Sequence, residues 1–216
     1  MRMYISRDYK HIVMAPSKCG SSTIEQMFQT RYHWDNVYLG KEISDPANIL
    51  NQYIDPIFMF NYKKVLLVRN PFDYIISGFR FMLLQNKKHN TFYFNKLTSH
   101  LLAIKKNVIK DQFWRNHCQH QPADFYNSTF VIHKLEKFDK FLNYLNKNCK
   151  KDYNLLPSYH IHRQKHIPYP EINEVDENLI LELTKKAADL TGYNIPKSIE
   201  NYKKKYNSGE LNELFT

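Results

Sequence analysis

The sequence predicts an α/β fold of three layers, in which helices flank a central, mainly parallel sheet. Two apolar segments, residues 10–15 and 63–69, have the continuous runs that are typical of strands buried on both faces. A third strand is indicated at residues 128–134. Helical spacing of apolar residues follows each of these segments, and such alternation of strand and helix is typical of layered α/β proteins.

Apolar spacing and capping residues predict the helices. They are expected at 22–31, after Ser44-Asp45-Pro46, after Asn70-Pro71, at 91–106, at 136–148 and at 176–191. In the last of these, Asp176 should begin the helix and Gly192 should end it. A short strand is expected at 36–39, and an irregular segment at 150–173, where three prolines occur.

Length and charge limit the possible functions. The 216 residues are expected to form a single domain over 1–216, with a formal net charge of +10. This charge suits nucleic acid, anionic polymers or phosphate-rich cofactors, although a well-solvated surface would explain it equally well. No apolar run approaches the roughly 20 residues of a membrane span, and the N-terminus lacks a signal-peptide pattern, so we expect a cytoplasmic protein. The odd count of cysteines predicts free thiols at Cys19, Cys118 and Cys149.

The segment between the first strand and the first helix has the residues of an anion-binding loop. Gly20 permits close approach of the backbone, and Lys18 adds a positive charge. Three hydroxyl side chains follow, from Ser21, Ser22 and Thr23, where a helix N-terminus attracts anions. An ordinary turn capped by serine is the alternative interpretation. The segment is not a Walker A loop, because Lys18 precedes the glycine instead of following it.

A second segment gives the loop a specific interpretation. In "VRNPFDYIISGF" (68–79), Arg69 ends a strand and Ser77 lies in the following helix. Together with "SKCGSST" (17–23), this segment resembles the motifs of the sulfotransferases, especially the carbohydrate sulfotransferases of the Golgi and their soluble relatives. The resemblance covers about residues 10–145 and implies a P-loop-like fold, whereas the helical C-terminal part, 150–216, has no counterpart motif.

The resemblance implies a cofactor and the residues that bind it. The cofactor is 3′-phosphoadenosine 5′-phosphosulfate (PAPS), and its product is adenosine 3′,5′-bisphosphate. In the family, the first motif binds the 5′-phosphosulfate, which assigns Lys18, Cys19, Gly20, Ser21, Ser22 and Thr23 to this role. The Arg and Ser of the second motif bind the 3′-phosphate, which assigns Arg69 and Ser77. No metal is expected.

The chain departs from the family pattern at two positions. Pro16 stands one residue earlier than the family's proline, so that Ser17 precedes Lys18. Tyr74 replaces a basic residue inside the second motif. Weaker similarities are the "NHCQHQ" segment at 116–121 and the strand-to-helix segment at 130–145.

The resemblance also suggests catalytic roles. Lys18 should neutralise the charge that develops on the oxygen bridging sulfur and phosphorus as the sulfuryl group leaves. A general base must then accept the proton of the acceptor hydroxyl. Glu42, in a Gly-x-Glu triplet similar to that of heparan 3-O-sulfotransferases, is our first candidate, followed by His33 and then His89. The acceptor is expected to be a carbohydrate or another hydroxyl-bearing substrate, and the basic net charge suggests an anionic one.

Two other functions compete with this interpretation. A basic nucleic-acid-binding protein would account for the net charge. In such a protein, however, aromatic residues should lie among basic ones, whereas here they follow apolar helical stripes. Nucleic acid is therefore not an expected partner. A nucleotide kinase with an atypical loop would leave Arg69 and Ser77 unexplained. The histidine-rich segments 117–120 and 160–166 lack the paired spacing of zinc ligands.

Overall fold

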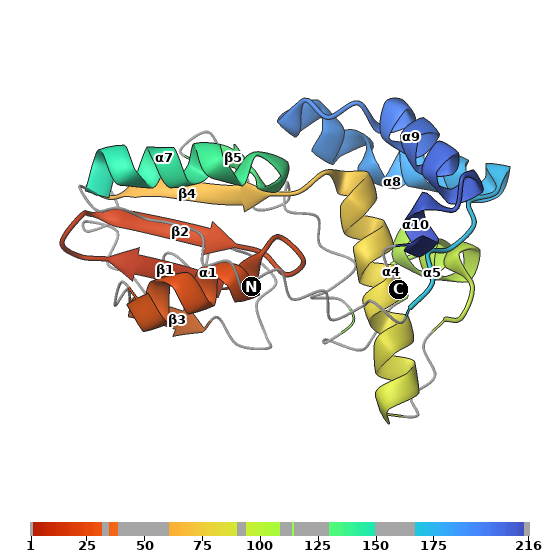
Figure 1. The fold of residues 1–216 in the computed structure, drawn as a ribbon, viewed down its shortest axis with the longest axis horizontal. Helices are drawn as coiled ribbons and strands as arrows, with labels where there is room; N and C mark the ends of the chain where they lie inside the picture. Colours follow the sequence, from red (N-terminus) through yellow and green to blue (C-terminus); the bar gives the residue numbers. More distant parts are fainter. Residues whose placement is uncertain are drawn as a thin grey trace. The chain divides into compact units, whose positions relative to one another are not determined.

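A computed structural model describes residues 2–31, 35–38, 61–89, 94–108, 114, 130–149 and 167–213 (Figure 1). The contacts divide the chain into two compact units, each made of two stretches of sequence. The sheet unit contains residues 1–69 and 122–161, and the helical unit contains residues 70–121 and 162–216. A single domain over the whole chain stays a prediction.

The sheet unit is built on a five-stranded sheet with the order β3-β1-β2-β4-β5. The strands are β1 Arg2–Ser6, β2 His11–Ala15, β3 Asp35–Tyr38, β4 Lys63–Val68 and β5 Phe130–Lys134. β2, β4 and β5 are parallel neighbours, whereas β1 pairs antiparallel with both β2 and β3. The predicted α/β class with a mainly parallel sheet is therefore confirmed, because β1 runs antiparallel to its neighbours and the other four strands share one direction.

The prediction missed β1, which forms a hairpin with β2. Its register pairs Arg2 with Ala15 and Ser6 with His11. The turn between the strands contains neither glycine nor proline, so it gave no turn signal in the sequence. Instead, Lys10 adopts the left-handed conformation, with φ 51°. Its carbonyl accepts a hydrogen bond from the Lys63 N–H at 2.8 Å, where β4 begins.

One face of the sheet is covered by two helical segments. The first consists of α1 Ser21–Glu25 and the π-helical turn η1 Gln26–Arg31, and the second is α7 Phe138–Cys149, which follows the 3₁₀ turn η4 Leu135–Lys137. Ile24 and Phe28 of the first segment and Phe141 of the second are fully buried in a single cluster with the sheet. On the opposite face, Ile12 and Leu66 are buried as well. Burial on both faces explains why β2 and β4 have continuous apolar sequences.

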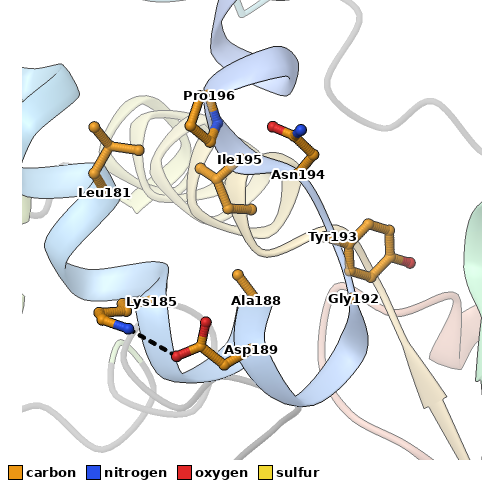
Figure 2. A pocket seen from close by; sticks show the side chains of 9 residues that line it. All are labelled: Leu181, Lys185, Ala188, Asp189, Gly192, Tyr193, Asn194, Ile195 and Pro196. Atoms are coloured by element: carbon orange, nitrogen blue, oxygen red, sulfur yellow. Dashed lines mark hydrogen bonds and ion pairs between the residues drawn. The ribbon is translucent and has the colours of Figure 1, made fainter.

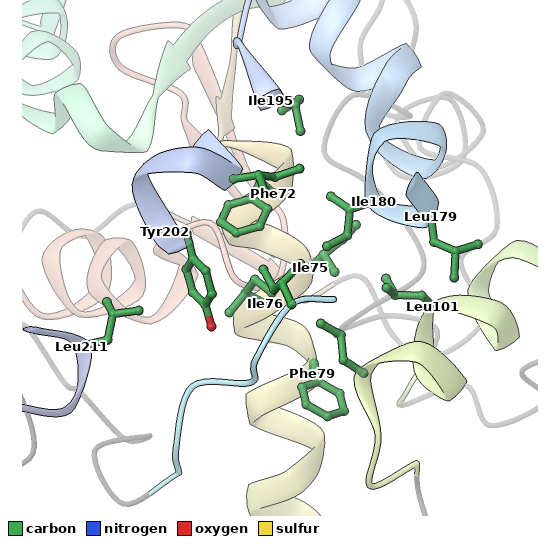
Figure 3. Packing of buried hydrophobic residues seen from close by; sticks show 13 residues of the cluster. Phe72, Ile75, Ile76, Phe79, Leu101, Leu179, Ile180, Ile195, Tyr202 and Leu211 are labelled. Atoms are coloured by element: carbon green, nitrogen blue, oxygen red, sulfur yellow. The ribbon is translucent and has the colours of Figure 1, made fainter. Parts of the chain in front are cut away.

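The described helices of the helical unit pack around an apolar cluster (Figure 3). They are α4 Pro71–His89, α5 Leu97–Lys105, α8 Glu174–Thr191, α9 Ile195–Asn207 and α10 Glu210–Glu213. Asn70 caps α4, because its Oδ1 accepts the Phe72 N–H at 3.0 Å, and its Nδ2 donates to Ser198 Oγ at 2.8 Å. Pro71 then occupies the first turn, where proline is tolerated.

The observed ends of α8 can be compared with the predicted ones, Asp176 and Gly192. The C-terminal prediction is confirmed, since Gly192 is the C-cap with φ 67°. The N-terminal prediction was off by two residues, because Asn173 caps the helix and Asp176 completes a capping box with it. Two helices beyond Gly192, α9 and α10, were not predicted individually. Asn194 caps α9 by accepting the Lys197 N–H at 3.0 Å.

His100 is a buried histidine at the packing surface between α5 and α4. It is 1% exposed, its ring lies 5.4 Å from the rings of both Phe79 and Trp114, and neither ring nitrogen has a hydrogen-bond partner among the described residues. Burial lowers the pKa of His100 to about 3. The imidazole is therefore neutral in the folded protein at neutral pH.

This burial predicts a specific acid sensitivity. Between pH 6.5 and about 3, the unfolded chain binds a proton at His100 that the folded protein does not bind. The free energy of unfolding should therefore fall as the pH drops, by up to about 1.4 kcal/mol per pH unit from this group. His100→Phe should remove this part of the slope in urea unfolding measured at several pH values. Identical slopes for the two proteins would contradict the prediction.

Candidate anion-binding site

The predicted anion-binding loop connects β2 to α1 in the sheet unit. Two of its residues have left-handed backbone conformations, Lys18 with φ 65° and Gly20 with φ 76°. Between them, the Cys19 N–H donates to the Pro16 carbonyl at 3.1 Å and closes a tight turn. Gly20 is the N-cap of α1 and forms no side-chain cap, so the alternative of an ordinary serine-capped turn is wrong.

The start of α1 leaves three backbone amides before the first intrahelical hydrogen bond. The first intrahelical hydrogen bond joins the Ile24 N–H to the Gly20 carbonyl at 3.1 Å, so the amides of residues 21–23 precede the helical ladder. Ser22 is exposed, and Ser21 and Thr23 are half-buried. The Tyr4 hydroxyl donates to the Ser21 carbonyl at 3.3 Å and thereby fixes this turn to β1. Such a helix start favours an anion.

Arg69 lies beside the loop, as expected for neighbouring parallel strands. β2 and β4 are in register, with Met14 opposite Leu66, so the residues after both strands meet at the carboxyl edge of the sheet. The Arg69 Nη1 donates to the Lys18 carbonyl at 3.2 Å. Arg69 as a whole is half-buried.

The end of β5 supplies a third contact to the loop, which sequence analysis did not identify. A Cβ atom placed on Gly20 would lie 2.8 Å from Leu135 Cδ1. Leu135 directly follows β5, so the ends of three adjacent parallel strands surround the loop. The only signal in the sequence was the family-like strand-to-helix segment that contains Leu135. A larger residue at position 20 would therefore have to displace the Leu135 side chain, besides adopting an unfavourable backbone conformation.

Cys19 lies in the loop with its side chain turned into the core. Its side chain is fully buried, as is that of Cys149, and both are free thiols as predicted. Burial raises the pKa of the Cys19 thiol to about 12, against the effect of the nearby Arg69 charge, and the Glu136 carboxylate raises it further. The thiol is therefore protonated and shielded from solvent, and the predicted role of Cys19 in binding is limited to its peptide group.

Ser77 and His89 belong to the helical unit. Ser77 is half-buried on α4, two turns after its start, and His89 is the last residue of the same helix. Tyr74, which replaces the family's basic residue, is 1% exposed, and its N–H donates to the Asn70 carbonyl at 2.8 Å. A buried position explains why an aromatic residue can stand there. The structure thus brings together Lys18–Thr23 and Arg69 within the sheet unit, with Ser77 in the other unit.

Several predicted residues lie outside the described part of the chain. These are Glu42, His33, the segment 116–121 and the histidines of 160–166. Within the described ranges, no group of three or more His, Cys, Asp or Glu side chains could hold a metal ion. None of the described helices combines the length and apolar character that crossing a membrane requires.

A pocket of about 430 Å³ lies in the helical unit where α8 is followed by α9 (Figure 2). On one side of the pocket, Lys185 and Asp189 form an exposed ion pair at 2.9 Å. Tyr193 and Asn194, in the segment that connects the two helices, also line the pocket. Among the described residues that sequence analysis assigned to the site, none lines this pocket.

Comparison with known proteins gives one match. Residues 1–211 match a protein-family model described as "Sulfotransferase family". This match includes both segments that carry the motifs and most of the C-terminal helices that sequence analysis could not assign. No curated protein and no solved structure matches the chain.

Proposed function

Because this chain belongs to the sulfotransferase family, whose members are transferases that use PAPS, we propose that it transfers the sulfuryl group of PAPS to a hydroxyl group of a carbohydrate. The observation that carries the proposal is the loop after β2. It combines a lysine, a left-handed glycine and a helix start with an arginine at the end of the neighbouring parallel strand. PAPS carries a phosphate at its 3′ position and a phosphosulfate at its 5′ position, so it needs two groups of hydrogen-bond donors.

The described residues fit the 5′-phosphosulfate of this cofactor. Gly20 has no side chain that could stand between a phosphate and the amides of residues 21–23. A Cβ atom at this position would also collide with Leu135. These amides, with the hydroxyls of Ser22 and Thr23, would bind the 5′-phosphate. Arg69 and Ser77 would bind the 3′-phosphate, for which the planar guanidinium is well suited.

When bound, PAPS supplies an activated sulfuryl group whose transfer leaves adenosine 3′,5′-bisphosphate. The task of the protein is to position the reactants and to neutralise developing charge, as in phosphoryl transfer. Lys18 provides a positive charge in the loop, where a fixed donor would stabilise the departing oxygen. The Arg69 contact to its carbonyl supports this role, because it restricts the backbone from which the side chain extends.

We propose Glu42 as the general base, with His33 and then His89 as the other candidates. A carboxylate in reach of the acceptor hydroxyl would accept its proton as the oxygen attacks sulfur. Glu42→Gln should lower kcat by about 10²- to 10⁴-fold and leave the affinity for adenosine 3′,5′-bisphosphate unchanged. Steady-state kinetics with isothermal titration calorimetry would test this, and a fully active Glu42→Gln enzyme would exclude Glu42 as the base.

Ligand-dependent thermal unfolding tests the proposed function most directly. Adenosine 3′,5′-bisphosphate at 100 times its Kd should stabilise the protein by about 2.7 kcal/mol. For a chain of this length, this corresponds to a rise in Tm of about 5 to 10 °C. ATP with Mg²⁺ and single-stranded DNA serve as comparison ligands, since they represent the kinase and the nucleic-acid-binding alternatives.

The outcomes of this experiment separate the three functions. Stabilisation by the bisphosphate, well above that by ATP or DNA at equal concentration, supports the sulfotransferase proposal. Stabilisation by ATP with Mg²⁺ and not by the bisphosphate would overturn it. A screen of neutral and anionic oligosaccharides with radiolabelled PAPS would then identify the acceptor, and failure of every carbohydrate against a reactive non-carbohydrate alcohol would reject the carbohydrate part of the proposal.

A further inference from the structure

We infer that Arg69 is a positioning residue for the loop after β2, because its guanidinium holds the backbone of Lys18 in the left-handed conformation. The inference rests on the proposed function and adds a role to the one that the family motif implies. Contact with a 3′-phosphate would explain an arginine at this position without any bond to the loop. The bond to the Lys18 carbonyl connects the two phosphate-binding segments through one side chain.

The backbone of Lys18 needs such support. A lysine at φ 65° is disfavoured by contact between its Cβ and its own peptide groups, and only the surroundings can maintain it. The hydrogen bond from Arg69 Nη1 fixes the peptide that joins Lys18 to Cys19. That peptide carries the Cys19 N–H, whose bond to Pro16 closes the turn before the start of α1.

Lys10, at the other end of β2, provides an internal comparison. It is also a left-handed lysine, with φ 51°, and its carbonyl also accepts a hydrogen bond from β4. There the donor is the backbone N–H of Lys63, which no substitution other than proline removes. At Lys18 the donor is a side chain. The conformation of the loop therefore depends on the identity of residue 69, whereas that of the hairpin turn does not depend on residue 63.

One guanidinium can serve both functions. The bond to the Lys18 carbonyl uses a single N–H of Nη1, and the remaining N–H groups can meet a phosphate. Removal of Arg69 should then weaken binding at both ends of the cofactor. An arginine that contacted only the 3′-phosphate would affect only ligands that contain this phosphate.

A comparison of two ligands separates these roles. Adenosine 5′-phosphosulfate lacks only the 3′-phosphate of PAPS, so its affinity reports on the loop. Arg69→Met, which keeps a long apolar stem, should reduce the affinity for this ligand by about 3- to 10-fold, as expected for one lost hydrogen bond. It should reduce the affinity for PAPS by a larger factor. Ser77→Ala is the matched control and should weaken the binding of PAPS alone.

The result that overturns the inference is equally definite. If Arg69→Met binds adenosine 5′-phosphosulfate as well as the natural protein does, Arg69 does not position the loop. Should Arg69→Met fail to fold, Arg69→Lys takes its place, since it keeps the charge but lacks the planar fork of donors.

Amide hydrogen exchange tests the inference without any ligand. In ligand-free Arg69→Met, the Cys19 N–H should exchange about 3- to 10-fold faster, because the turn closed by Pro16 opens more often. The Lys63 N–H, bonded to Lys10, should be unchanged. Unchanged exchange at Cys19 would refute the positioning role even if the protein proved to bind no PAPS. Failure of the natural protein to bind PAPS would count against the proposed function alone.

Discussion

Lys18→Ala should reduce the rate of sulfuryl transfer by about 10²- to 10³-fold or more while the protein stays folded. This is the usual effect of removing one donor from the position where charge develops in a transition state. The side chain is half-buried at a loop that β2 and β4 hold in place, so its truncation leaves the core intact. Initial rates with labelled PAPS, together with the midpoint of thermal unfolding, would measure the two effects separately.

Lys10→Ala is the matched control for this variant. It removes a lysine from a similar left-handed conformation at the opposite end of β2, so the change in charge and in backbone preference is the same. Its rate of transfer should equal that of the natural protein within a factor of about two. If Lys18→Ala kept full activity, or if Lys10→Ala lost as much as Lys18→Ala, the catalytic assignment of Lys18 would be wrong.

Gly20→Ala should disturb both the backbone of the loop and its packing against Leu135. An alanine at φ 76° has an unfavourable backbone conformation, which costs about 1 to 2 kcal/mol. The new Cβ would also lie 2.8 Å from Leu135 Cδ1, so the leucine must move. We expect unfolding to become easier by about 1 to 3 kcal/mol. Activity should fall by at least about tenfold, because a misplacement of about 1 Å can be that costly.

Three further variants identify the cause of the effect. Gly192→Ala has nearly the same φ, 67°, and nothing within 4 Å of the added Cβ, so it should lose stability from the backbone alone and keep its activity. Leu135→Ala combined with Gly20→Ala removes the close contact and should recover part of the loss, relative to Leu135→Ala alone. Urea unfolding of these four variants and the natural protein would measure the losses of stability. Equal losses for Gly20→Ala and Gly192→Ala would show that Leu135 does not constrain the loop.

The fold could be predicted where a sequence pattern records burial on both faces. β2 and β4 were found because residues 12–15 and 65–68 are buried on both faces of the sheet, which requires a continuous apolar run. β1 was missed because the turn that pairs it with β2 has no glycine or proline, and a lysine adopts the left-handed conformation there. The place of β1 in the sheet depends on this pairing and not on a local preference.

The site was predictable to the extent that its chemistry is local. Lys18, Gly20 and the three hydroxyl residues lie within six positions, so one loop could be identified as an anion site from the sequence. Leu135 is far from this loop in sequence and has no polar group, so nothing marked it as a neighbour of Gly20. The cap of α4 was predictable because Asn70 bonds to Phe72, two residues on, whereas its bond to Ser198 of α9 left no signal in the sequence.

The sequence by itself determined the α/β class, the anion-binding loop and the order of the two family motifs, because each depends on residues close together in the chain. Only the tertiary structure decided that a side chain at the end of β4 holds the carbonyl of Lys18 and that a leucine after β5 lies against Gly20. Parallel strands are far apart in sequence, and their carboxyl ends meet only when the sheet forms. The contacts that shape this loop therefore exist only in the folded chain.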